Sequence, residues 1–435
     1  MDFALNLFII IADQFMLFVV NMLVARHAGE ALFGDFSVAT SALLLLATFI
    51  TLGIDSIIAY YIPKYYIQEK YSDIVSLTQS IKDFLQPIYT TMFVSGLLCS
   101  IALIALARAL SDITLFDLSH PLFLFLWGTV ALSLYNIFIQ YFRAVDYMRT
   151  AVVLSLLQTL CYFLLSLAIY FYIFPRFFHD DPHYFPHVML IGFILSYLII
   201  VLVSLIINRR SKIQIYKDIA NQRPTQWREK IYGYTVQNLN RYVFATIPLM
   251  VIEWLGHNEH SVGLFSATSS IINLAFIAIA PIGILIGPDI SAAFAQSREQ
   301  LKAVMRKYLL ICFAIALVIM AIMGFTARQV LLLYQSNFID ALPYTYACLI
   351  NVVTYSISMP LSKMIQYSRE GSSVGARLTM SMLLLQTIAS IILVRWLGLL
   401  GAVICYVGIN IVYNAIMIVI AIRIFRIEEF GERVI

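Results

Sequence analysis

Twelve long apolar runs constrain the fold of this sequence more than any other feature. A helix of about 20 apolar residues crosses the hydrocarbon core of a bilayer, and each run holds 21–27 residues. The runs occupy residues 4–25, 36–62, 84–107, 122–142, 150–174, 187–207, 232–254, 262–287, 304–325, 341–362, 376–396 and 399–422. We therefore expect an all-α integral membrane protein with twelve transmembrane helices.

The composition supports a membrane protein and excludes several other classes. Of the 435 residues, 61% are hydrophobic and 12% are charged, whereas soluble domains are about 45–50% apolar and about 25% charged. A net charge of +4 gives no reason to expect a nucleic-acid partner. All five cysteines fall within the runs, so we expect buried thiols without disulfides. The first run lacks a basic leader and a cleavage site, which favours a span over a signal peptide.

The distribution of Lys and Arg predicts the orientation in the membrane. With twelve spans, 22 of the 28 basic residues fall on the side of the two termini and five on the opposite side, while Arg241 lies inside a run. Cytoplasmic loops carry the excess of basic residues. Both termini are therefore expected in the cytoplasm, and the protein is expected to be multi-pass in the cytoplasmic (inner) membrane.

Three short sequences recur at nearly one offset. They are GDFSVATS at 34 and GLFSATSS at 263, IQYFR at 139 and IQYSR at 365, and LLQT at 156 and 384. Each pair relates a run to the run six places later. Because an offset of six spans preserves the orientation of each helix in the membrane, the two halves should be related by an axis along the membrane normal. We predict two pseudo-twofold six-helix bundles, 1–207 and 232–435, around a central cavity, joined by a basic cytoplasmic linker at 208–231.

Polar side chains inside the runs are the candidate functional residues, because a charge at the bilayer centre costs about 2.5–3.5 kcal/mol on insertion scales. Residues expected to line a cationic substrate cavity are Arg26, Arg241, Asn240, Gln237 and Asn21. Arginine suits bidentate contact with phosphate. Asp13 and Asp55 are candidates for binding a coupling proton or sodium ion. An Asp–Arg pair that only stabilises the bundle is the alternative reading.

The sequence offers no catalytic or metal-binding arrangement. It lacks a Gly-rich phosphate loop followed by Lys-Ser or Lys-Thr, and the His and Asp residues at 179–187 lack the spacing of a metal site. We therefore expect neither an enzyme nor a bound cofactor or metal, and a proton or sodium gradient is the expected source of energy.

Four stretches resemble a known family. Residues 24–37 read VARHAGEALFGDFS, 52–55 read LGID, 262–265 read VGLF and 396–402 read WLGLLGA. They resemble the corresponding stretches of polysaccharide (O-antigen-type) flippases of the multidrug/oligosaccharidyl-lipid/polysaccharide (MOP) exporter superfamily. Two departures stand out: residues 27–28 replace the usual apolar-Leu pair, and residues 240–242 read Asn-Arg-Tyr where many relatives have an acidic residue. The second departure leaves proton coupling through that helix an open question.

The resemblance implies a function and partners. Such proteins move polyprenyl-diphosphate-linked oligosaccharides across the bacterial inner membrane by alternating access for cell-surface polysaccharide biosynthesis, and Arg26 matches the family's Arg at the end of the first span. The implied partners are the lipid-linked substrate, the bilayer and a polysaccharide polymerase or glycosyltransferases, with the protein itself a monomer.

Other functions remain open from the sequence. A drug/cation antiporter of the same superfamily is the nearest alternative, although it would favour acidic cavity residues. A major-facilitator carrier would need a Gly-rich basic motif between the second and third spans, which is absent. A membrane-embedded glycosyltransferase or ligase would need a large outer loop with catalytic acids.

Overall fold

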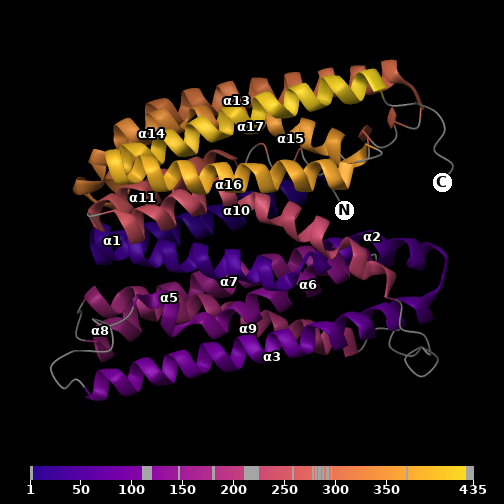
Figure 1. Cartoon of the computed structure of the whole chain (residues 1–435). Helices are drawn as coiled ribbons and strands as arrows, with labels where there is room; N and C mark the ends of the chain where they lie inside the picture. Colours follow the sequence, from indigo (N-terminus) through magenta and orange to yellow (C-terminus); the bar gives the residue numbers. More distant parts are fainter. Residues whose placement is uncertain are drawn as a thin grey trace. The chain divides into compact units, whose positions relative to one another are not determined.

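A computed structural model gives the fold of the chain. It describes residues 3–109, 120–145, 147–178, 182–209, 225–256, 259–276, 279, 282, 286, 289–290, 293–294, 296–368 and 371–427. All regular structure in these ranges is helical (Figure 1).

The helices of the first half of the chain are α1 (Phe3–Thr51), α2 (Ile54–Ile67), α3 (Tyr71–Ala109), α5 (Pro121–Leu124), η1 (Leu126–Gly128), α6 (Thr129–Ala144), α7 (Met148–Ala168), the π-helix η2 (Ile169–Ile173), α8 (Phe174–Phe177), η3 (Pro182–Tyr184) and α9 (Phe185–Arg209). Those of the second half are η5 (Gln226–Lys230), α10 (Ile231–Leu255), α11 (Glu259–Phe276), α13 (Arg298–Tyr334), η6 (Ser336–Ala341), α14 (Leu342–Cys348), α15 (Ile350–Tyr367), α16 (Gly371–Leu397) and α17 (Leu399–Ile427).

Every predicted run carries helix, but runs and helices do not correspond one to one. The first two runs share α1, which is two helices joined at Gly29, and the second run continues into α2. Within the described ranges, seven helices are long and apolar enough to cross a membrane, and a bent pair could add an eighth. One other run falls short for a local reason, because α6 has only 16 residues.

The bend in the tenth run coincides with neither of its prolines, since Pro343 lies at the start of α14 and Pro360 inside α15. Helices Ser336–Cys348 and Ile350–Ile365 meet at an angle of 41°. Proline permits a bend in a membrane helix but does not impose one where neighbouring groups can satisfy the freed backbone.

The described structure forms two compact units. Unit 1 comprises Met1–Ile9 and Asp35–Leu239, and unit 2 comprises Ile10–Gly34 and Asn240–Ile435. The first helical stretch of α1 thus groups with the second half of the chain, and the first turns of α10 group with the first half. The repeat-based halves and the linker at 208–231 stay a prediction, since contacts do not test a repeat.

Unit 1 is held together by apolar side chains from α2, α3, α6, α7 and α9. Ile57, Phe142, Leu154 and Ile200 are almost completely buried in one continuous cluster. Trp227, which lies in η5 and precedes α10, belongs to the same cluster. The end of the predicted basic linker is therefore anchored in the core of this unit.

Unit 2 has an aromatic centre. The rings of Phe18, Phe33, Tyr334 and Phe338 pack with centroids 5.5–5.9 Å apart. These residues come from both stretches of α1 and from the end of α13 and η6, so the cluster fixes residues 18–33 against the α13–η6 corner. Helices α15, α16 and α17 pack beside one another in the same unit.

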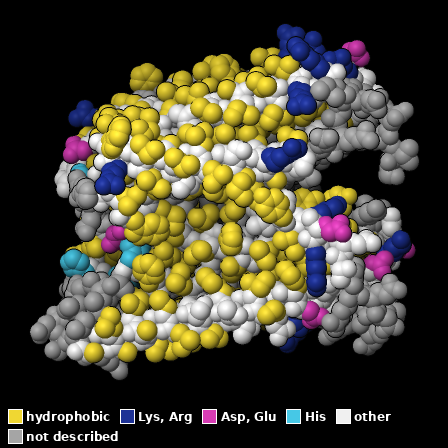
Figure 2. Space-filling view, in the orientation of Figure 1, with side chains coloured by type: hydrophobic (Ala, Val, Ile, Leu, Met, Phe, Trp, Pro, Cys, Tyr) yellow, Lys and Arg dark blue, Asp and Glu magenta, His cyan; other side chains and the backbone are white. Residues whose placement is uncertain are grey.

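The outward surfaces suit a hydrocarbon environment. In α3 and in α13, only 17% of the most apolar 18-residue segment is buried inside the protein. Figure 2 shows hydrophobic side chains over the middle of the visible face, with Lys and Arg near the ends of the helices. An apolar exterior of this kind is stable in lipid and not in water.

Candidate functional site

The second predicted span is broken inside unit 1. Helix α1 ends at Thr51 and α2 begins at Ile54, and the two residues between them have φ values of 53° (Leu52) and 66° (Gly53). The Gly53 carbonyl accepts hydrogen bonds from the backbone N–H groups of Ser56 and Ile57, which starts the new helix at once.

Helix α10 explains why the second of these residues is glycine. A Cβ on Gly53 would lie 2.6 Å from the backbone nitrogen of Thr235 and 2.7 Å from the Cβ of Tyr234. Such distances are incompatible with any side chain, and the positive φ also favours glycine. The break in the second span is therefore the point where α10 packs directly against it.

The break places the Asp55 carboxylate opposite an amide of α10. Asp55 Oδ1 accepts a hydrogen bond from the Ser56 backbone N–H at 2.9 Å and from Asn238 Nδ2 at 2.7 Å. The Ser56 hydroxyl donates in turn to Asn238 Oδ1 at 3.1 Å, which fixes the amide from both sides. Asp55 lies in the first turn of α2, where the helix dipole favours a negative charge.

A buried hydroxyl chain supports the other side of the break. Thr51 Oγ1 donates to the Ala47 carbonyl at 2.6 Å and lies 2.6 Å from Ser133 Oγ, which is itself 2.6 Å from the Tyr89 hydroxyl. Since a hydroxyl has one proton to donate, the chain runs from Tyr89 to Ser133 to Thr51. It joins α3, α6 and the end of α1.

Asp55, one of the two carboxylates predicted from the sequence to bind a coupling ion, thus lies at a helix break beside an amide of α10. The carboxylate is half-buried in a helix pair expected to cross a membrane, and it accepts hydrogen bonds from the Ser56 backbone N–H and the Asn238 amide. Ionisable groups in such positions commonly serve proton or ion pathways, and broken helices form the ion sites of many transporters. Protonation of Asp55 would weaken it as the acceptor for the Asn238 amide. Binding of a proton at Asp55 would therefore alter the contact between α2 and α10.

The structure places the other candidate residues in different surroundings. In unit 2, Gln14 Nε2 lies 3.5 Å from Asp13 Oδ2, and Asn21 Nδ2 donates to Ser270 Oγ at 3.4 Å. The Arg26 side chain is exposed, while its carbonyl accepts a 2.6 Å hydrogen bond from Gln335 Nε2. These three residues are thus distributed along the first stretch of α1.

The remaining candidates lie on α10. Gln237, Asn240 and Arg241 are helical, but their side chains lie outside the described part of the structure. A cationic cavity formed with Arg26 therefore stays a prediction. Asn238, from the same tract, was not among the candidates, although the clustering of amides in this helix was a signal for it.

The glycines of the repeated sequence form a close helix contact within unit 2. A Cβ on Gly34 would lie 2.9 Å from Val262 Cβ and 3.0 Å from the backbone nitrogen of Gly263, and a Cβ on Gly263 would collide with the Glu30 carbonyl. Glu30 also forms an ion pair with His260. These residues join the start of α11 to the middle of α1.

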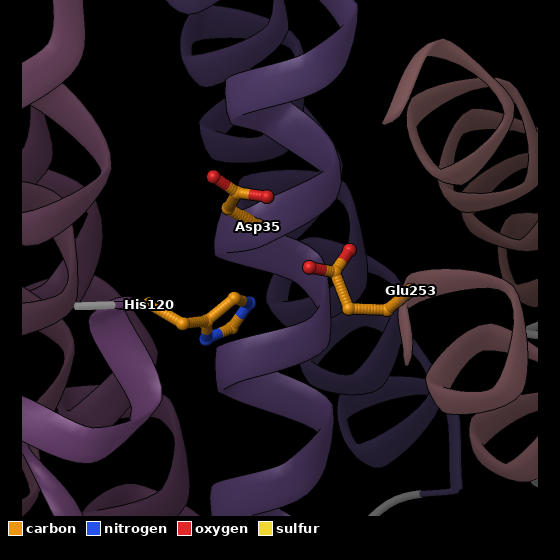
Figure 3. Close-up of side chains that lie close together, drawn as sticks. All are labelled: Asp35, His120 and Glu253. Carbon is orange, nitrogen blue, oxygen red and sulfur yellow. The ribbon is translucent and has the colours of Figure 1, made fainter. Parts of the chain in front are cut away.

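A histidine and a carboxylate come together elsewhere in unit 1. Asp35 of α1 and His120 have ligand atoms within 4.8 Å of each other (Figure 3). His120 Nδ1 accepts the Leu122 backbone N–H at 3.2 Å and so caps α5. Glu253, also labelled in Figure 3, belongs to α10 in unit 2. The capping bond gives His120 a structural role.

Long apolar helices, a broken span and an intramembrane carboxylate define a polytopic helical membrane transporter. The model of the polysaccharide biosynthesis protein family matches residues 2–294, and the chain belongs to that family. This confirms the resemblance to the MOP superfamily. No curated protein sequence matches the chain significantly.

Solved structures share the fold at low sequence identity. A structure described as an inward-facing conformation of a multidrug resistance MATE family transporter of the MOP superfamily aligns with a TM-score of 0.73 and 17% identity, covering 95% of this chain and 94% of that one. A MOP superfamily transporter from Pyrococcus furiosus, for which a reversed polarity of the binding pocket is described, aligns at 0.67 and 16%, covering 97% and 94%. The predicted all-α transmembrane fold is confirmed.

Proposed function

We propose that this protein is a flippase that moves a polyprenyl-diphosphate-linked oligosaccharide across the cytoplasmic membrane of a bacterium. The observation that carries the proposal is the family match over residues 2–294, because that family is defined by polysaccharide biosynthesis and the fold is that of transporters. A membrane protein that serves polysaccharide synthesis without catalytic motifs is best suited to moving the lipid-linked intermediate. The arginines Arg26 and Arg241 fit an anionic diphosphate cargo.

The orientation belongs to the same proposal. Both termini face the cytoplasm, since 22 of the 28 Lys and Arg residues would otherwise lie outside. The substrate is then loaded from the cytoplasmic leaflet, where its synthesis by glycosyltransferases ends, and is delivered to a polymerase outside.

The polar contact between α2 and α10 is the proposed coupling element. Asp55 binds a proton or a sodium ion, and the Asn238 amide senses the change because it is held by the same carboxylate and by Ser56. Transport driven by an ion gradient needs such a group inside the spans.

The test is reconstitution into proteoliposomes with a fluorescent polyprenyl-diphosphate oligosaccharide, scoring its appearance in the opposite leaflet. We expect movement that accelerates when a proton or sodium gradient is imposed. Asp55→Asn keeps an oxygen acceptor but cannot bind the proton, so the gradient-driven rate should fall about tenfold or more. The matched control is Asp73→Asn, which removes an exposed carboxylate at the start of α3.

A drug/cation antiporter is the second candidate, because the structures that share the fold include multidrug resistance MATE transporters. It predicts efflux of organic cations from the same proteoliposomes. Active efflux without any movement of the lipid-linked sugar would replace the flippase proposal with this one.

A further inference from the structure

The residues that precede α10 are fixed on the surface of unit 1. Trp227 in η5 is 1% exposed, its Nε1 donates to Ser80 Oγ at 3.3 Å, and its ring packs edge-on against Phe84 at 5.4 Å. Because a buried tryptophan anchors this short helix, the neighbouring cations are held in place before any ligand binds, which lowers the entropic cost of binding.

Lys230, three residues beyond Trp227, is held over aromatic rings of α2. Its Nζ lies 3.7 Å from the ring centroid of Tyr60 and 5.1 Å from that of Tyr61. Tyr234 interacts electrostatically with the same three residues. Burial lowers the pKa of Lys230, but the Tyr60 and Tyr61 phenols outweigh this effect and raise it. The ammonium is therefore charged at neutral pH.

This cluster has the chemistry of a phosphate site. Within the described ranges, no carboxylate lies within ion-pair distance of Lys230. An ammonium group has three donors, and a ring below it leaves donors free on the opposite side. Phenol hydroxyls can donate to phosphate oxygens as well. An aromatic belt would explain single Tyr and Lys residues, whereas here one lysine is shared by tyrosines of two helices.

The position of the cluster links it to the proposed coupling element. Tyr60 is 52% exposed and lies near the end of the predicted second span, and Lys230 directly precedes the predicted seventh. Tyr60 follows Asp55 by five residues on α2, about 7.5 Å along the helix axis, and Tyr234 precedes Asn238 by one turn of α10. An anion on the cluster would therefore act on the same pair of helices as the ion at Asp55.

We propose that Lys230, Tyr60, Tyr61 and Tyr234 form a loading site that binds the diphosphate of a lipid-linked substrate at the cytoplasmic membrane surface before transport. The proposal rests on the flippase function and assigns its first binding step. Lys230 supplies the charge, and the tyrosine hydroxyls supply the additional donors that distinguish a diphosphate from the single phosphate of a bulk phospholipid.

The test measures binding of geranylgeranyl diphosphate to the full-length protein in phosphatidylcholine nanodiscs. Lys230→Gln should raise the Kd about tenfold, as expected for loss of a charge-assisted hydrogen bond, and Lys230→Arg should restore part of the affinity. Tyr60→Phe keeps the ring below the ammonium and should raise the Kd about threefold by removing a donor. The matched control is Lys307→Gln in α13, where Lys307 Nζ lies 5.2 Å from the ring centroid of Tyr308. This variant should leave the Kd unchanged.

Competing ligands distinguish the sources of phosphate. Inorganic pyrophosphate should compete with the probe, and phosphatidylglycerol in the nanodisc should not. An unchanged Kd for Lys230→Gln, or equal displacement by phosphatidylglycerol, would overturn the loading site. A thermal midpoint equal to wild type for each variant shows that a lost affinity is not a lost fold.

The loading site and the flippase function can fail separately. Diphosphate binding that depends on Lys230 in a protein that moves no lipid-linked sugar would retain the site and reject the flippase. Flipping by the wild-type protein, together with binding that is insensitive to Lys230→Gln, would reject the site and retain the flippase.

Discussion

The helical run that opens the chain is interrupted twice by glycine, and the two interruptions have different surroundings. Gly29 has φ 78° and ψ −174°, and nothing lies within 4 Å of a Cβ added there. Gly53 has φ 66° and would place a Cβ 2.6 Å from the backbone of Thr235. Only the backbone conformation requires glycine at position 29. At position 53, close packing against a helix about 180 residues away in sequence requires it as well.

The break at Gly29 changes the direction of the chain, whereas the break at Gly53 also forms part of the candidate site. At Gly29 the backbone changes direction, and the residues that follow are held by helix packing and the Glu30–His260 pair. At Gly53 the closeness of α10 brings Asn238 within hydrogen-bond distance of Asp55. Ionisable side chains inside membrane-spanning segments are costly and are commonly functional. The contact at Gly53 is therefore the stronger candidate for a functional site.

The largest expected effect is that of Gly53→Ala. The positive φ costs of order 1–3 kcal/mol for a non-glycine residue, and the collision with α10 adds about 1–3 kcal/mol. We expect a much lower thermal unfolding midpoint in detergent and poor yield. Gly53→Leu should be worse still, because a larger side chain meets the same backbone.

A smaller effect is expected for Gly29→Ala. The backbone conformation alone costs of order 1–3 kcal/mol, with no steric addition. The sharp form of this prediction is that Gly29→Leu lowers the unfolding midpoint no further than Gly29→Ala does. A large gap between those two variants would show that the surroundings of Gly29 are crowded after all.

Asn238→Ala should be milder in stability than Gly53→Ala but should impair transport. It removes the donor to Asp55 and leaves the Ser56 hydroxyl without its acceptor, at about 1–3 kcal/mol. The unfolding midpoint and the gradient-driven flipping rate measure the two consequences, with Asn410→Ala of α17 as a control for the loss of an amide that bonds only its own helix. A wild-type rate in Asn238→Ala would separate the amide from coupling.

The smallest effect is expected for Glu30→Gln. In this pair His260 is 40% exposed and Glu30 only 9%. Glutamine keeps a polar oxygen against the histidine, so the loss of the charge should cost no more than about 1 kcal/mol. The unfolding midpoint should change little, both at low and at high salt. A large drop would place the Gly29 junction beside the Gly53 break in importance.

The sequence predicted the helices well because hydrophobic length is a local property. The twelve runs all carry helix, and the Leu52–Gly53 turn was visible as a motif. The repeat identified Gly34 and Gly263 as equivalent residues but could not show that they lie in contact. The faces on which two distant helices meet are set by tertiary packing, which cannot be read from a single sequence.

The candidate site was predicted in part for the same reason. Asp55 was selected because a carboxylate inside a span is rare, but its partner Asn238 could not be chosen from among the amides of the same tract. Lys230 was assigned to a basic linker, since its charge matched its neighbours there. The tryptophan at 227 in an otherwise polar stretch was the one signal that this segment is anchored.

The contact at Gly34 and Gly263 restricts how α1 and α11 can change. A Cβ on Gly34 would meet Val262 and the backbone nitrogen of Gly263, and a Cβ on Gly263 would meet the Glu30 carbonyl. Because backbone atoms lie against both glycines, shortening a neighbouring side chain cannot make room for a larger residue at either position. Any such residue would have to move one helix away from the other.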